Sequence, residues 1–466
     1  MMSSKRPTPP APDSRSLCAP SWRRSNMPQA YDTLFENAQI LTMVDACPAM
    51  EGCVGVRDGR IDLVGPLPEG ALAKRRIDCK GQILMPGLVN AHAHTPMCIM
   101  RGYADDYPLK TWLFEKVFPA EARLDERAVL AGARLGFAEQ LCTGTTSVSD
   151  MYYHEPAIAA IALEAGMRVS LCNAVVALAP DWSMEKDRGI RETFSMLRDY
   201  QGAGDGLVQV EASIHAEYTS APSVWRLVAE LARKHGLGVQ LHLSETRAEH
   251  EEAKARNGGK TPAYALAEQG VFEGRVTAAH CVWLEEADRA LLAEKGVSAV
   301  HCPVSNLKLG SGVADVAAMR RAGINVALGT DGCCSNNTHD LFEEIKLAAL
   351  LAKGKAFDPT VLSAYEALKM ATVNGAQAQG RPDIGQVAEG MQADLIVLDL
   401  DHPTTRPSYD PFGAVVYSAT GRSVRLTMVQ GRILFEGGIF TTINLEKAYA
   451  EAEQYAKLRV LGEERK

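Results

Sequence analysis

Short apolar runs alternate with longer amphipathic segments through the middle of the chain. Between the runs, or after them, apolar residues recur at three- and four-residue spacing, as in Val224–His235, Leu284–Lys295 and Leu341–Lys353. Strands that alternate with helices form a parallel sheet, and eight strands can close a barrel. The pattern predicts an α/β fold with a (β/α)8 TIM-like barrel. The eight expected strands are Ile83–His94, Thr145–Asp150, Met167–Val175, Leu207–His215, Gly238–Glu245, Val276–Cys281, Val297–Ser305 and Ile324–Asp331.

The two flanks of this region carry a different pattern. Tyr31–Ile83 holds short alternating runs broken by turn residues, and Ala393–Gly437 is similar. We expect the two flanks to pair into one small β-sandwich beside the barrel. The expected organisation is a disordered extension over 1–30, sandwich strands over 31–85, the barrel over 86–384, further sandwich strands over 385–440 and a C-terminal helix over 441–466.

Composition narrows the class of protein. The 466 residues are 46% hydrophobic and 23% charged, an ordinary globular mixture. The net charge of −8 leaves no excess of positive charge to neutralise phosphates, which argues against nucleic acid as a partner. No apolar run approaches the roughly 20 residues of a membrane-spanning helix. The extension up to residue 30 has no apolar segment of a secretory signal, and Met27 is an alternative start. Eleven cysteines without a C-x-x-C pair suggest reduced thiols and a cytoplasmic protein.

Polar residues stand at or near the carboxyl ends of the apolar runs. A buried strand without a function has little reason to end on an imidazole or a carboxylate, and barrel enzymes place catalytic groups at the carboxyl ends of their strands. We therefore expect the active site at this end of the barrel. The residues concerned are His92, His94, Asp150, Asn173, His215, His242, His280, His301 and Asp331.

The spacing of two histidines favours a metal ion. In His92-Ala93-His94 the two imidazoles point to the same face of a strand, so both can reach one ion. His242 is a candidate third ligand, and Asp331, between glycines, can present its carboxylate to a cation. Taken singly, each residue has a plainer reading, a satisfied core histidine or an exposed turn aspartate. Their shared position at strand ends favours the metal site.

Two further residues suit proton transfer. Glu245 follows the strand that ends near His242, a position that suits a carboxylic acid moving protons. The alternative is a Ser-Glu turn that caps a helix. His280 ends an apolar run and is either a catalytic residue or a buried core histidine.

The spacing of residues in the sequence excludes several other kinds of catalytic or binding site. The cytidine-deaminase zinc site needs H-x-E with P-C-x-x-C, and the chain has no C-x-x-C. Gly259-Lys260-Thr261 resembles the end of a phosphate-binding loop, but residue 254 is Lys where Gly is required. No G-x-G-x-x-G and no G-x-S-x-G is present.

Together these motifs resemble those of the amidohydrolase superfamily, and more closely those of its 5-methylthioadenosine/S-adenosylhomocysteine deaminase group. The likeness runs from about residue 31 to about residue 440. It is carried by Pro86–His94, Met100–Asp106, His242–Thr246, Ala279–Cys281, Ser305–Leu309 and Gly329–Asn337.

The resemblance implies a function and roles for named residues. It implies a hydrolase of cyclic amidines that releases ammonia from an aminated purine nucleoside such as 5-methylthioadenosine, S-adenosylhomocysteine, 5-deoxyadenosine or adenosine. The alternative is an aminohydrolase or chlorohydrolase of guanine, cytosine, a pterin or an s-triazine. One divalent ion is implied, Zn2+ first and Fe2+ or Mn2+ as alternatives, because the run Leu207–His215 lacks the lysine that two-metal relatives use. A homo-oligomer acting on a small molecule is expected. The implied metal ligands are His92, His94, His242 and Asp331; the catalytic residues are Glu245, His280 and Asp331; and the substrate contacts are Glu121, His215, Trp112, Asn173 and Ser305.

Four departures from the family pattern concern the substrate pocket. Glu217 and Asn173 replace a proline and an arginine, so we expect a substrate with a neutral or cationic tail rather than an anionic one. Cys302 replaces an asparagine, and Cys333-Cys334 replaces small residues; we interpret these cysteines as packing residues. A scaffold without activity is the remaining alternative, and the intact set of ligands argues against it.

Overall fold

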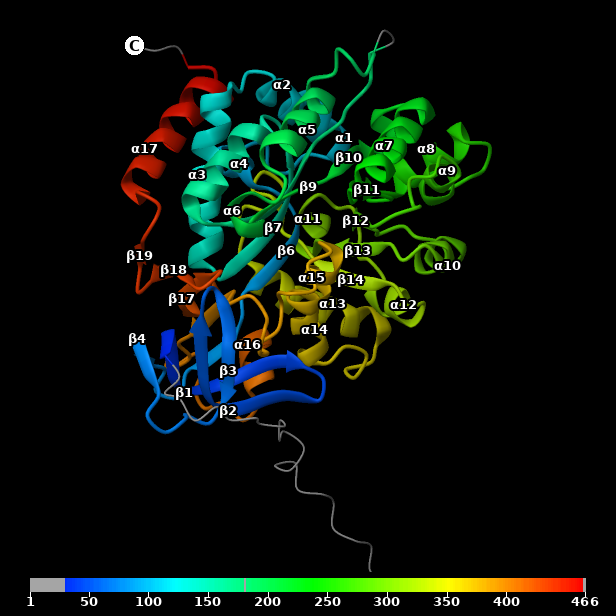
Figure 1. Ribbon diagram of the computed structural model, residues 1–466. Helices are drawn as coiled ribbons and strands as arrows, with labels where there is room; N and C mark the ends of the chain where they lie inside the picture. Colours follow the sequence, from blue (N-terminus) through cyan, green and yellow to red (C-terminus); the bar gives the residue numbers. More distant parts are fainter. Residues whose placement is uncertain (1–29, 180–181, 464–466) are drawn as a thin grey trace, which may run out of the picture.

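The computed structural model describes residues 30–179 and 182–463, so the predicted extension over 1–30 lies almost wholly outside the described residues. Within them, ten strands form two parallel sheets of five strands each (Figure 1). One sheet has the order β15 (Asp331–Gly332), β6 (Leu88–His94), β7 (Thr145–Tyr152), β8 (Arg168–Asn173), β9 (Val208–Val210). The other has the order β10 (Ala212–Ala216), β11 (Val239–Leu243), β12 (Val276–His280), β13 (Ser298–His301), β14 (Asn325–Leu328).

Helices follow most of these strands and pack on their outer side (Figure 1). Helix α7 illustrates why they form. Pro222 occupies its first turn, where no N–H is needed, and Gly236 ends it with a φ of +66° that a glycine adopts without strain. The helices are α1 (Leu109–Thr111), α2 (Phe118–Glu121), α3 (Glu126–Cys142), α4 (Glu155–Ala165), α5 (Arg188–Asp199), α6 (Ala203–Gly206), α7 (Pro222–His235), α8 (Arg247–Arg256), α9 (Pro262–Glu268), α10 (Glu286–Glu294), α11 (Pro303–Lys308), α12 (Val316–Arg321), α13 (Leu341–Ala356), α14 (Ala364–Met370), α15 (Val373–Ala378), α16 (Pro411–Tyr417) and α17 (Leu445–Tyr455).

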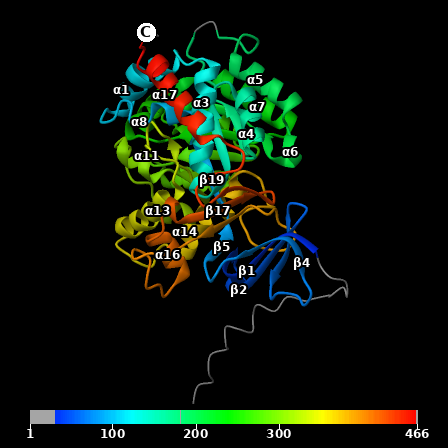
Figure 2. The ribbon, with the colours of Figure 1, turned by 90° about the vertical axis from the view of Figure 1, so that its left-hand side faces the viewer.

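A nine-stranded sheet brings the two flanks of the chain together. Strands β5 and β16 pair antiparallel, with Leu395 opposite Pro86. Strands β1, β2 and β4 lie at the end of the molecule away from the C-terminus (Figure 2). The order is β19 (Ile439–Phe440), β18 (Arg432–Glu436), β17 (Val424–Val429), β16 (Leu395–Leu398), β5 (Ile83–Pro86), β1 (Ala30–Val44), β2 (Cys47–Arg57), β3 (Arg60–Gly65), and β4 (Leu72–Asp78) pairs with β1.

Several expected strands are shorter or divided. The first, Ile83–His94, divides at Gly87 into β5 of the nine-stranded sheet and β6 of a parallel sheet. The run Val297–Ser305 ends as a strand at His301, because Pro303 begins helix α11 and cannot donate to a strand ladder. The run Leu207–His215 divides at Glu211, whose buried carboxylate accepts hydrogen bonds from Gln240 (2.7 Å) and Arg275 (2.6 Å). The run that ends at Asp331 also divides, into β14 and β15.

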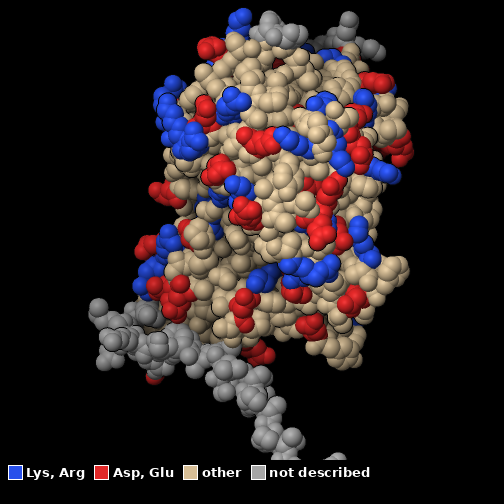
Figure 3. Space-filling view, turned by 90° about the vertical axis from the view of Figure 1, so that its right-hand side faces the viewer, with Lys and Arg blue, Asp and Glu red and all other residues tan. Residues whose placement is uncertain are grey.

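The surface shows no large patch of a single charge on the face that is drawn in Figure 3. Acidic and basic side chains are interspersed over the face drawn in Figure 3, rather than gathered by sign. In the described part of the chain, no helix combines the length and the apolar character that crossing a membrane requires. Among the residues that the structure describes, nine cysteines are free thiols.

One buried ion pair joins β8 to the start of β16. Arg168 and Asp394 are each 2% exposed, and the guanidinium donates to both carboxylate oxygens, at 2.6 and 3.0 Å. Burial and the charge of Arg168 lower the pKa of the nearby Arg381 to about 10. Asp394 therefore neutralises a region that holds two guanidinium groups.

Removing that negative charge should destabilise the fold. We expect Asp394→Asn to lower the free energy of unfolding by about 3–5 kcal/mol, since a buried guanidinium is left without its counter-ion. Urea-induced unfolding followed by circular dichroism measures the change. The matched control is Asp401→Asn, because Asp401 pairs with Arg406 at 2.8 Å where both side chains are mostly exposed. A loss of stability no greater than that of the control would contradict the prediction.

Candidate metal centre

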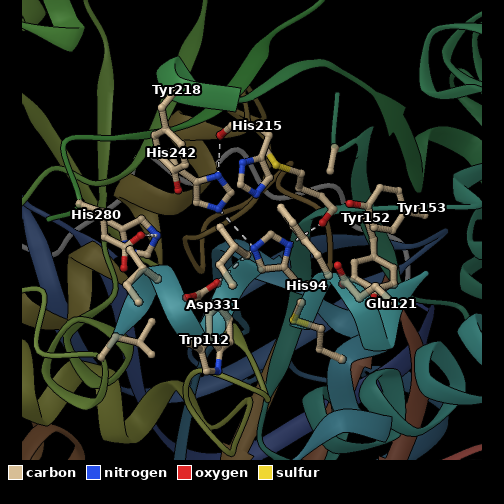
Figure 4. Close-up of a pocket in the computed structure, with 18 residues that line it drawn as sticks. His94, Trp112, Glu121, Tyr152, Tyr153, His215, Tyr218, His242, His280 and Asp331 are labelled. Atoms are coloured by element: carbon tan, nitrogen blue, oxygen red, sulfur yellow. Dashed lines mark hydrogen bonds and ion pairs between the residues drawn. The ribbon is translucent and has the colours of Figure 1, made fainter. Parts of the chain in front are cut away.

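Four side chains from distant parts of the chain converge at the carboxyl ends of the parallel strands. Ligand atoms of His92, His94, His242 and Asp331 all lie within 4.8 Å of one another, and all four residues are buried. Asp331 Oδ1 lies 3.2 Å from His94 Nε2 and 3.6 Å from His92 Nε2. Nε2 of His242 lies 3.3 Å from Nε2 of His94. Figure 4 shows His94, His242 and Asp331 directed toward one another.

Hydrogen bonds to the backbone orient two of the imidazoles. His94 Nδ1 lies 2.5 Å from the carbonyl oxygen of Met151, and His242 Nδ1 lies 2.6 Å from that of His215. A carbonyl can only accept, so each Nδ1 carries the hydrogen and each Nε2 faces the centre. Histidines that bind metals are held in this way.

The ligand histidines differ in acidity, because burial lowers the pKa of His92 to about 4 and that of His242 well below its ordinary value. Burial alone lowers the pKa of His94, but the hydrogen bond to Asp331 and its charge outweigh burial and raise that pKa to about 9. Nε2 of His92 is buried and has no hydrogen-bond partner among the described residues. Three imidazole nitrogens and a carboxylate oxygen, one of the nitrogens without a hydrogen bond among the described residues, fit a divalent cation.

The two oxygens of Asp331 have separate partners. Oδ2 accepts hydrogen bonds from the hydroxyls of Ser305 (2.6 Å) and Ser335 (2.8 Å), which leaves Oδ1 to face the imidazoles. Asp331 has a φ of +62°, a strained value for a residue other than glycine. Position 329 requires a glycine because the backbone of His92 lies close to it. An added Cβ would lie 2.7 Å from the carbonyl oxygen of His92.

Glu245 and His280 lie beside the ligand set. Glu245 Oε2 is 3.8 Å from His280 Nε2, and Oε1 accepts from Ser311 Oγ at 2.9 Å. His280 Nδ1 lies 2.9 Å from Oδ1 of Asn306, which orients its ring. Burial raises the pKa of Glu245 above its ordinary value. The backbone N–H of Glu245 donates to Glu249 at 2.7 Å, in the turn that begins α8. Thr246 and Glu249 cap this helix, so the Ser244-Glu245 turn of the alternative reading is not its cap.

A cavity that is partly open to solvent leads to the ligand set. Trp112, Glu121 and His215 line it, together with Glu245 and His280, as the family resemblance implies. Glu121 lies on the opposite side of the ligand set from His280 (Figure 4). The rest of the lining is Met97, Leu109, Leu113, Phe118, Met151, Tyr152, Tyr153, Ala174, Tyr218 and Leu309, with His94, His242 and Asp331 at the inner end.

The pocket changes the acidity of two of these residues. Burial raises the pKa of Glu121 to about 7, although the neighbouring Tyr152 opposes the rise. Burial and the nearby histidines lower the pKa of His215 to about 3, so its ring is neutral at pH 7. The ring of His215 lies 4.6 Å from that of His242. A neutral imidazole and a carboxyl group that titrates near neutrality thus face the cavity.

Three expected pocket residues lie elsewhere. Ser305 is fully buried behind Asp331, and Asn173 is 2% exposed; neither lines the cavity. Glu217 is 3% exposed, and its carboxylate pairs with Arg256 at 2.5 Å and with Asn257 at 2.8 Å. Glu217 therefore places no negative charge in the cavity, because Arg256 neutralises its carboxylate outside it. The preference for a neutral or cationic substrate tail stays a prediction.

Two residues that line the cavity were not predicted from the sequence, and two residues at predicted strand ends do not line it. Tyr152 and Tyr153 line the cavity at the end of β7, two and three residues after the Asp150 that ended the expected strand. Asp150 does not line it, and its carboxylate accepts from the Thr95 N–H at 2.5 Å. His301 is buried away from the cavity. The strand-end rule located this edge of the sheet but could not give the direction of each side chain.

Comparison with known proteins gives consistent results. Residues 83–434 match the model of the amidohydrolase family. The chain is 44% identical over 405 residues, 86% of this chain and 94% of the relative, to a 5-methylthioadenosine/S-adenosylhomocysteine deaminase of Moorella thermoacetica. It is 41% identical over 428 residues, 91% of this chain and 98% of the relative, to a 5'-deoxyadenosine deaminase of Methanosarcina mazei. A zinc-bound crystal structure described as an adenosine deaminase from Xanthomonas campestris superposes with a TM-score of 0.87 at 34% identity, covering 94% of this chain and all of that one.

Proposed function

Because this chain belongs to the amidohydrolase family, we propose that it is a metal-dependent hydrolytic deaminase of an aminated purine nucleoside. The observation that carries the proposal is that the metal ligands lie at the inner end of the cavity. His94, His242 and Asp331 form the inner end of a pocket whose walls hold two carboxyl groups and a neutral imidazole. The relatives named as deaminases of 5-methylthioadenosine, S-adenosylhomocysteine and 5'-deoxyadenosine support this class of substrate.

The ligand set supports a single divalent ion, and we infer Zn2+. Three imidazole nitrogens and one carboxylate oxygen are a donor set that zinc accepts, and the similar adenosine deaminase contains zinc. When bound, the ion acts as a Lewis acid that activates water near neutral pH. His92, His94, His242 and Asp331 would hold it.

Three side chains of this protein would move or hold protons. Asp331 Oδ1, fixed because Oδ2 is bonded to two serine hydroxyls, accepts a proton from the attacking water. Glu245 delivers a proton to the ring nitrogen beside the carbon that bears the amino group. The proton taken up by Asp331 then passes to the amino group, which leaves as ammonia, while Glu245 takes back a proton from the hydroxyl group added at that carbon. His280, oriented by Asn306, holds the water on the side of the centre nearest Glu245.

The remaining cavity residues would bind the nucleoside. Trp112 and His215 offer ring faces and a neutral nitrogen to the purine, and Glu121 offers carboxyl oxygens to the ribose hydroxyls. A second cavity adjoins the first across Phe118, Glu121 and Tyr153 and contains Arg188. A 5'-substituent of the ribose would extend toward it. The charge of Glu217 is neutralised outside the cavity, so it does not act on this substituent.

The proposal extends to the architecture. We infer that the two parallel sheets form one eight-stranded barrel and that the nine-stranded sheet belongs to a small sandwich beside it. Contacts between the two sheets support the closure: the N–H of His215 in β10 donates to the carbonyl oxygen of Val175, two residues past β8, and β14 lies against β6. The expected domain limits at 85, 384 and 440 stay predictions.

Ammonia release tests the function. The zinc-loaded protein would be assayed with adenosine, 5-methylthioadenosine, 5'-deoxyadenosine, S-adenosylhomocysteine, guanine and an amino-s-triazine. We expect at least one adenine nucleoside to have a kcat/KM at least about 100-fold above those of guanine and the triazine, because the pocket holds groups placed for a ribose. If guanine or the triazine were the best substrate, the proposal would be wrong.

A further inference from the structure

A second group of metal-binding side chains lies outside the cavity. Cys98 in the 3-10 helix after β6, Glu139 in α3, and Cys333 and His339 in the segment after β15 bring their ligand atoms within 4.8 Å of one another. The two sulfur atoms are 3.4 Å apart, and Oε2 of Glu139 lies 3.4 Å from Sγ of Cys98 and 3.8 Å from Sγ of Cys333. Both cysteines and the histidine are buried, and none of the four residues lines the catalytic cavity.

The imidazole of His339 is oriented as a ligand. Its Nδ1 lies 3.0 Å from Oγ1 of Thr330. The single hydroxyl hydrogen of Thr330 goes to the carbonyl oxygen of Asp331 at 3.1 Å, so this hydroxyl accepts from Nδ1–H of His339. Nε2 therefore carries a lone pair. It is buried beside the cysteines, with the Cys98 thiol as its neighbour. Metal-bound histidines commonly donate their other N–H to an oxygen in this way.

The distances fit a small tetrahedral ion. With Zn–S bonds of about 2.3 Å and Zn–N or Zn–O bonds of about 2.0–2.1 Å, tetrahedral ligand atoms lie about 3.3–3.8 Å apart. The three separations among the sulfurs and the carboxylate oxygen lie in this range. The sulfurs are too far apart for a disulfide, whose bond is about 2.05 Å long.

The charges also balance. Arg101 donates to Glu139 at 2.6 and 3.1 Å and lies against the cluster. A divalent cation, two thiolates, one carboxylate and one guanidinium sum to zero, and burying such a set avoids the cost of an isolated charge. The carboxylate is further held by the backbone N–H of His339 at 3.1 Å.

We propose that Cys98, Glu139, Cys333 and His339 form a second metal site, which takes Zn2+ or another thiophilic divalent cation. Four protein ligands leave no open position, which is the arrangement of a structural site rather than a catalytic one. The ion would tie the segment after β15 to α3 and to the helix after β6. Since Cys333 follows Asp331 by two residues, the site would also fix the segment that carries this catalytic carboxylate.

The metal content of the purified full-length protein tests the proposal. After loading with Zn2+ and removal of the excess, we expect two ions per wild-type chain and one per chain in Cys333→Ala and in His339→Asn. The asparagine amide can still donate to Thr330 but has no group in the position of Nε2, so the second variant should fold even if the first does not. The matched control is Cys334→Ala, whose buried sulfur lies 3.2 Å from the carbonyl oxygen of Tyr103, and it should keep two ions.

Cobalt substitution distinguishes the two sites without an activity assay. The catalytic ligand set contains no sulfur, so a thiolate-to-Co2+ charge-transfer absorption can arise only at the second site. We expect this absorption in the wild type and in Cys334→Ala, and its loss in the double variant Cys98→Ala/Cys333→Ala. A wild type that binds one ion and lacks the absorption would overturn the proposal. So would a Cys98–Cys333 disulfide found by mass spectrometry in protein purified with its metal.

Discussion

Replacing Glu245 with glutamine should lower kcat by about 10²–10⁴-fold while the protein keeps its metal, because a general acid–base group contributes that much and an amide cannot move a proton. The substitution keeps the shape of the side chain and an oxygen that can accept from Ser311 Oγ, now 2.9 Å away. Glu245 is not among the grouped metal ligands, so the ion should stay bound. Steady-state kinetics on the preferred nucleoside, with metal analysis of the same sample, measures both effects.

The control for this substitution is Glu252→Gln in helix α8. Its side chain is more than half exposed and pairs only loosely, at 3.7 Å or more, with Arg256 and Lys110. We expect this variant to have wild-type kcat and KM. If Glu245→Gln retained nearly full turnover with its metal bound, the proton shuttle would have to be another group, and Glu245 would be a structural residue.

The order of elements and the metal ligands were readable because both depend on local pattern. His92 and His94 lie two residues apart on a strand, and each later ligand follows its own apolar run. Parallel strands carry their carboxyl ends to one edge, so residues far apart in sequence were expected together. The observed grouping of His92, His94, His242 and Asp331 agrees with that reasoning.

The sequence does not predict the direction of side chains in the helices and loops that follow the strands. Ser305 belongs to a segment that carries the resemblance, yet its hydroxyl faces Asp331 rather than the cavity. Glu217 sits two residues after His215, and only the fold shows that Arg256 neutralises it. Such pairs join helices and loops whose mutual approach has no periodic signature in the chain.

The cysteines illustrate the same limit. Cys333 and Cys334 are neighbours in sequence, and nothing in the pattern separates them. In the fold Cys333 faces Cys98, while Cys334 faces the carbonyl oxygen of Tyr103. The strand-end pattern does not indicate His339, because this residue follows no apolar run. A site assembled from a short helix, a long helix and an irregular segment has no spacing motif by which it could be found.

The largest loss of activity is expected for Asp331→Asn, because one carboxylate has two roles. It would hold the ion, and it would accept the proton of the attacking water. We expect kcat/KM to fall by at least about 10³-fold and the protein to lose most of its catalytic metal. The asparagine amide can keep one hydrogen bond to Ser305 or Ser335, so the fold should persist, which circular dichroism would verify.

A second variant with a smaller change distinguishes the two roles of Asp331 from a general disturbance of the site. Ser305→Ala removes one of two hydroxyls bonded to Oδ2 and leaves Ser335 in contact. We expect a loss of about 10-fold in kcat/KM with the metal retained, the size of effect seen when an outer partner of a ligand is removed. If both variants lost activity equally, the carboxylate would matter only for the packing around it. If Asp331→Asn kept both metal and activity, Asp331 would be neither the ligand nor the base, and the catalytic cation would have to be held by the three imidazoles alone.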